Sequence, residues 1–119
     1  MSREFPEADW KRFRVLKDLA LQRFCQRILD EVKYVITEPS RTAHERYGEV
    51  YRVMKERDKE VADAFDGMSR SNAFLQLLQI RRKGLLTDEE MAQFTPETRD
   101  RVDEIIRTFS KGGAKADEK

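Results

Sequence analysis

One segment of the chain constrains the fold more than any other. From Glu7 to Ile36 it contains neither glycine nor proline, and it is rich in Leu, Arg, Lys, Gln and Glu, which are good helix formers. Pro6 stands just before it, where a first-turn proline is tolerated. The segment predicts one helix of about 45 Å at 1.5 Å per residue. A compact domain of 119 residues does not need such a length, so we expect an elongated or paired molecule.

The apolar residues of this segment form a broad stripe. One set follows the spacing of three and four that places side chains on one helix face: Trp10, Phe13, Leu16, Ala20, Phe24, Ile28, Val32 and Val35. A second set widens the stripe well beyond one seam: Leu19, Leu21, Cys25, Leu29 and Ile36. We therefore expect the helix to have neighbours on two sides.

Composition favours an all-α fold. A chain of 119 residues has room for one core, and 5 glycines with 3 prolines are too few for the many tight turns of an all-β protein. Charged residues make up 39% of the chain, as do hydrophobic ones, which is typical of a heavily solvated particle. Residues 1–109 are predicted to form a single helical domain. Residues 110–119 lack apolar periodicity and are predicted to be a disordered tail.

A second long helix should pack against the first. Pro39 disfavours α geometry at Glu38, and Ser40 is a plausible N-cap for a helix over residues 41–65. The short turn predicts an antiparallel hairpin. The apolar residues of the second helix keep heptad order, with Arg57 in place of one of them: Ala43, Tyr47, Val50, Met54, Val61 and Ala64.

The rest of the chain predicts three further helices. Gly67 ends the second, and residues 70–83 form a helix that is apolar nearly all round and should lie at the centre. Gly84 ends that helix, and the capping-box spacing of Thr87 and Glu90 predicts a short helix over 88–94. Thr95 and Pro96 open the last one. The predicted fold is an antiparallel bundle of four main helices plus one short helix.

Residues 74–91 carry a local resemblance to a known family. They run as an apolar helix, the basic end Arg81-Arg82-Lys83, and then Gly84, Leu86, Thr87, Glu89, Glu90 and Met91 at matching positions. This pattern resembles the SHOCT-type short helical hairpins found at the C-termini of many bacterial proteins. The resemblance implies an element for oligomerisation or docking and no catalytic residues. In this chain the family's usual basic continuation is replaced by residues 92–96.

Residues with catalytic or ligand-binding chemistry are sparse. Ser40 and the single histidine, His44, lie in a capping context without an oxyanion loop of glycines, which argues against a nucleophilic triad. The single cysteine, Cys25, lies mid-helix on an apolar flank and is expected to act as a small buried hydrophobe. Zinc clusters, di-iron sites and phosphate-binding glycine loops need residues that are missing. We expect no catalytic, metal or cofactor site, and so no enzyme.

The remaining signals favour binding to another protein or to a second copy of the chain. The aromatic anchor candidates are Trp10, Phe13, Tyr47 and Tyr51. The alternative is nucleic-acid binding, through basic residues of the first helix and through Arg70, Arg81, Arg82 and Lys83, although the net charge of +1 provides no overall attraction. The competing interpretation of the Arg81 cluster is pairing with the acidic segment over 88–104. A lone cysteine and the lack of a long apolar run predict a cytoplasmic chain without a transmembrane segment.

Overall fold

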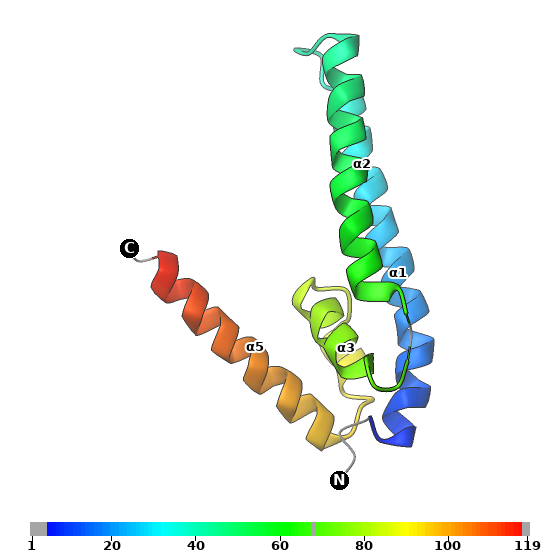
Figure 1. Ribbon diagram of the computed structural model, residues 1–119, viewed down its shortest axis with the longest axis vertical. Coiled ribbons are helices and arrows are strands. Elements are labelled where there is room, and N and C mark those ends of the chain that lie inside the picture. Colours follow the sequence, from blue (N-terminus) through cyan, green and yellow to red (C-terminus); the bar gives the residue numbers. More distant parts are fainter. Residues whose placement is uncertain (1–4, 68, 118–119) are drawn as a thin grey trace.

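The computed structural model describes residues 5–67 and 69–117, with side chains up to Phe109. This part of the chain is all-α, as predicted, and holds no strand. Its helices are α1 (Glu7–Ile36), α2 (Ala43–Phe65), α3 (Ala73–Arg82), α4 (Asp88–Met91) and α5 (Pro96–Asp117). In Figure 1, α1 and α2 run side by side as a long hairpin, α3 lies against its lower part, and α5 diverges from α3. The molecule is elongated, with extents of 57 × 38 × 24 Å.

Helix α1 has the bounds that the sequence predicts, because no residue in it interrupts the backbone hydrogen bonds. It buries the predicted stripe of Phe13, Leu16, Ala20, Phe24 and Ile28. Thr37 ends the helix, and its hydroxyl donates to the carbonyl of Lys33 at 2.9 Å. The antiparallel hairpin is confirmed.

Helix α2 begins two residues later than predicted, and its N-cap is Thr42 rather than Ser40. Thr42 accepts from the amide of Glu45 at 3.1 Å, and the Glu45 carboxylate accepts from the amide of Thr42 at 2.8 Å, which completes a capping box. Ser40 donates to Glu38 instead, at 2.9 Å. Both residues are good caps in isolation, but only Thr42 has an acidic residue three positions on.

The core is concentrated at the lower end of the hairpin, where α3 and the segment after it pack against α1. Rings of Phe5 and Phe13 meet edge-to-face with centroids 5.9 Å apart, and Phe74 and Phe94 complete the aromatic cluster around Phe5. Burying each ring stabilises the fold by roughly 2–3 kcal/mol. Helix α3 is central, as predicted, although Leu75 faces solvent.

Helix α3 is shorter than the predicted span over 70–83, and Asn72 is its N-cap residue. Gly67 and Gly84 adopt left-handed backbone angles of +67° and +73°, so both predicted stops are confirmed. Helix α4 begins after Thr87 as predicted and ends at Met91, three residues before the expected Phe94.

Helix α5 begins at Pro96, as predicted, and buries Val102. It continues to Asp117 and so includes residues 110–117, which were predicted to be disordered. It does so although each of the two glycines there costs about 1 kcal/mol relative to alanine. The last two residues of the predicted tail, 118–119, lie outside the described part of the chain.

Candidate interaction surface

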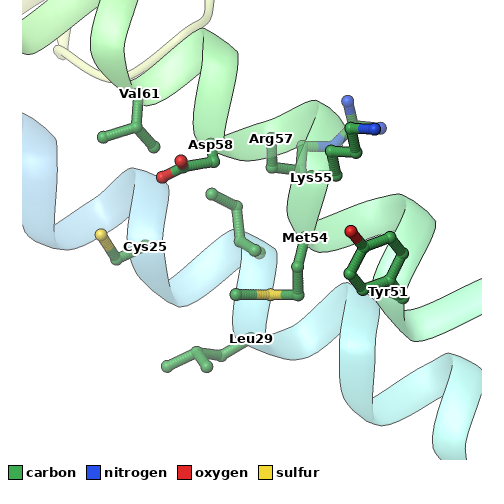
Figure 2. Close-up of a pocket in the computed structure, with 9 residues that line it drawn as sticks. Cys25, Leu29, Tyr51, Met54, Lys55, Arg57, Asp58 and Val61 are labelled. Atoms are coloured by element: carbon green, nitrogen blue, oxygen red, sulfur yellow. The ribbon is translucent and has the colours of Figure 1, made fainter. Parts of the chain in front are cut away.

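The upper half of the hairpin exposes apolar side chains from both helices. Leu29 on α1 is 58% exposed, and Tyr51 and Met54 on α2 are 64% and 46% exposed. These residues line a solvent-open groove of about 570 Å³ between α1 and α2, together with Cys25, Ile28 and Val61. In Figure 2, Leu29 from α1 and Met54 from α2 project to the same side of the groove. We call this feature the hairpin groove.

The groove continues as an apolar face toward the turn of the hairpin. Ile36 lies two turns after Leu29 on the same side of α1, and Tyr47 lies one turn before Tyr51 on α2. Both side chains are exposed, Tyr47 by 72%. The guanidinium of Arg46 donates to the carbonyl of Ile36 at 2.7 Å, which fixes these two helix ends beside each other. The exposed apolar face therefore spans about 16 Å of α1, from Cys25 to Ile36.

Ion pairs border the groove. Arg57, the charged residue in the predicted heptad seam, reaches across the hairpin and donates from Nε to Glu31 at 3.0 Å. Arg57 also pairs with Glu60. The Glu60 carboxylate in turn accepts a hydrogen bond of 2.8 Å from Lys83, the residue that follows α3. The hydrogen bond from Lys83 is the main cause that lowers the pKa of Glu60. Arg57 thus bridges α1 and α2, whereas Tyr47 and Met54 of the predicted seam are exposed.

The predicted aromatic anchors separate into two groups. Phe13 is 0% exposed and Trp10 is half-buried against the core, so the structure places Phe13 among the packing residues and not on a surface. Tyr47 and Tyr51 are exposed on the face of the hairpin groove. The sequence did not single out Leu29, Met54 and Cys25 as surface residues. The signal for Leu29 and Cys25 was the widened stripe of α1, and the signal for Met54 was the heptad pattern of α2.

Most of the predicted nucleic-acid contacts serve the chain itself. Arg70 donates to the carbonyl of Phe5 at 2.8 Å, Arg81 pairs with Asp88 at 2.5 Å, and Arg82 lies over the ring of Phe109 at 4.7 Å. Lys83 pairs with Glu60, as described above. Contact between Arg81 and the acidic segment is the arrangement that the competing interpretation predicted.

Basic residues of α1 also bind groups within the chain. Arg23 binds Glu90 through two hydrogen bonds of 2.6 and 2.8 Å, and Arg27 donates to the carbonyls of Lys83 and Gly84. Lys17 is buried, and desolvation lowers its pKa. These side chains hold the turn after α3 against α1. They do not form one continuous basic patch.

Neither Ser40 nor His44 lines the hairpin groove. His44 is exposed in the first turn of α2, and the Ser40 hydroxyl is bonded to Glu38. Across residues 5–67 and 69–117, no group of three or more His, Cys, Asp and Glu side chains is arranged to hold a metal ion. Nor does any helix in those ranges have the length and apolar character needed to cross a membrane.

Comparison of the chain with protein-family models, with curated proteins and with solved structures finds no match. Residues 74–91 do form a helix, a turn at Gly84 and a second helix start with a capping box. Their similarity to SHOCT-type hairpins stays a prediction.

Proposed function

We propose that this chain is a non-enzymatic interaction module, adaptor-like or oligomerising, that binds a protein through the hairpin groove. The observation that carries the proposal is the groove itself, about 570 Å³ in volume, with Leu29, Tyr51 and Met54 exposed along it. Contiguous exposed apolar surface is costly in water, and it marks sites where another surface is buried. Tyrosine is also enriched among the residues that dominate binding energy.

Two further features fit an interaction role. The SHOCT-type resemblance of residues 74–91 implies docking or oligomerisation, and the single cysteine, Cys25, suits a reducing cytoplasm. We therefore place the module in the cytoplasm.

Site-specific photo-crosslinking tests the proposed surface. A photoreactive phenylalanine in place of Tyr51, expressed in the native cells, should give a discrete covalent adduct with a protein because its ring lies on the groove. The same group in place of Asp63, which is exposed on the opposite side of α2, should give none. Adding Leu29→Lys to the Tyr51 variant should abolish the adduct. Equal crosslinking from both positions, or none from Tyr51, would contradict the proposal.

Nucleic-acid binding is the alternative, and the contacts of Arg70, Arg81 and Lys83 within the chain do not support it. A mixed oligonucleotide pool at low salt discriminates between the two functions. Retention that falls steeply with salt would favour nucleic acid, since phosphate contacts release counterions.

A further inference from the structure

The molecule exposes more surface than a compact chain of its mass. Its accessible surface is 8420 Å², whereas a folded monomer of 14.1 kDa exposes about 6,700 Å². Its radius of gyration is 17.3 Å, against about 13.5 Å for a compact domain of 119 residues. The excess of about 1,700 Å² comes from the extended hairpin and from α5, which diverges from it (Figure 1), and it is larger than the roughly 800 Å² that each partner buries in a standard interface. The surface of one chain is therefore large enough to accommodate a second copy.

The groove carries charges of both signs that can pair with those of a second copy. Five charged residues of α2 are already in ion pairs within the chain: Glu49, Arg52, Glu56, Arg57 and Glu60. Lys55 and Asp58 line the groove beside Arg57, and both are exposed. Neither forms a salt bridge among the described residues. They carry opposite charges and lie one turn apart on α2.

This spacing is self-complementary. When two α2 helices pack antiparallel about a two-fold axis midway between residues 55 and 58, Lys55 of each copy faces Asp58 of the other. The same axis brings Tyr51 of one copy toward the end of the groove that Cys25 and Val61 line in the other. A formal net charge of +1 leaves little long-range repulsion between the copies.

We propose that the occupant of the hairpin groove is a second copy of this chain, paired antiparallel along α2 with reciprocal contacts between Lys55 and Asp58. The inference rests on the proposed interaction function and assigns its partner. The two hairpins together form a four-helix arrangement, in which the groove faces of both copies become a shared apolar layer.

Charge reversal with measurement of mass in solution tests this pairing. Light scattering over a micromolar concentration series should show the wild type at twice the mass of one chain. Lys55→Glu places like charges together at two symmetric sites, and Asp58→Lys does the same with the opposite sign. Each should raise the dissociation constant about tenfold or more, and the double variant should return it to near the wild-type value. Arg107→Glu on α5 is the control with an equal change in charge and should leave dimerisation unchanged.

Alkylation of Cys25 supplies a readout that needs no variant. Pairing covers the groove, so the rate of maleimide labelling should fall as protein concentration rises.

A wild type that stays a monomer over the series overturns the second-copy proposal. The proposal is also overturned if the wild type is a dimer but the double variant does not regain the wild-type dissociation constant, because Lys55 and Asp58 then do not contact each other across the interface. A monomer whose Tyr51 crosslinker captures a different protein leaves the interaction function standing, whereas a monomer without adducts contradicts both.

Discussion

At the scale of single residues, Asp9 joins the first long helix to the last. Its side chain is 1% exposed. One carboxylate oxygen accepts from the amide of Thr95 at 2.8 Å, and the other accepts from the hydroxyls of Thr95 and Thr98 at 2.7 and 2.6 Å. The first turn of α1 thereby holds the first turn of α5. A sequence pattern cannot show this contact, because it joins residues from opposite ends of the chain.

Replacing Asp9 with alanine should lower the free energy of unfolding by about 3 kcal/mol, since three donors lose a charged acceptor within a buried site. Urea denaturation followed by circular dichroism measures the change. Asp18→Ala, an exposed aspartate on the same helix, is the control and should shift stability by less than about 0.5 kcal/mol. Equal effects of the two variants would show that the buried contact contributes nothing.

Glu90 makes stability depend on pH. Hydrogen bonds from Arg23, and then from Thr87, lower its pKa to about 2 from an ordinary 4.5. Because the folded-state pKa is the lower one, this contribution is complete above about pH 4.5 and is lost as pH falls toward 2. Glu90→Gln should lower the free energy of unfolding at neutral pH. It should also make that free energy fall less steeply between about pH 4.5 and pH 2. Urea titrations at several pH values measure this, with exposed Glu89→Gln as the control; an unchanged slope in Glu90→Gln would count against the Arg23 contact.

At the scale of helices, the beginning of α2 distinguishes two candidate caps, of which only Thr42 has the capping-box spacing to Glu45. Thr42→Ala should cost about 1 kcal/mol of stability because it removes the acceptor for the amide of Glu45. Ser40→Ala should leave the free energy of unfolding within about 0.5 kcal/mol, since Ser40 caps no helix. Thermal melts of both variants give the comparison. A larger loss from Ser40→Ala would mean that α2 begins earlier in solution.

Helices with strong local signals could be predicted from the sequence, and those that depend on distant contacts could not. The bounds of α1 follow from helix propensity alone, and Gly67 and Gly84 act through their own backbone angles. Helix α3 begins at Ala73 instead of Arg70, after a segment in which the Arg70 side chain donates to the distant carbonyl of Phe5. Of the candidate surface, periodicity could identify the second apolar side of α1. It could not show that this side faces solvent next to Tyr51 and Met54.

At the scale of the whole molecule, the core and the exposed face occupy different ends of the hairpin. Aromatic packing around Phe5 stabilises the lower end, where α3 and α5 meet α1. The upper end consists of two helices only, and two helices cannot bury all the apolar residues that they carry. The exposed groove is a consequence of this division, and a second copy of the hairpin would supply the missing layer.

The contact of Asp9 also bears on the order in which the chain folds. The two helices of the hairpin are joined by a short turn, so they can meet early at little loop-closure cost. Asp9 and Thr98 are 89 positions apart and can meet only after the intervening helices have packed. This bond should be absent from the folding transition state, and its strength should set how fast the native chain opens rather than how fast it forms. Asp9 would then act chiefly on the lifetime of the folded molecule.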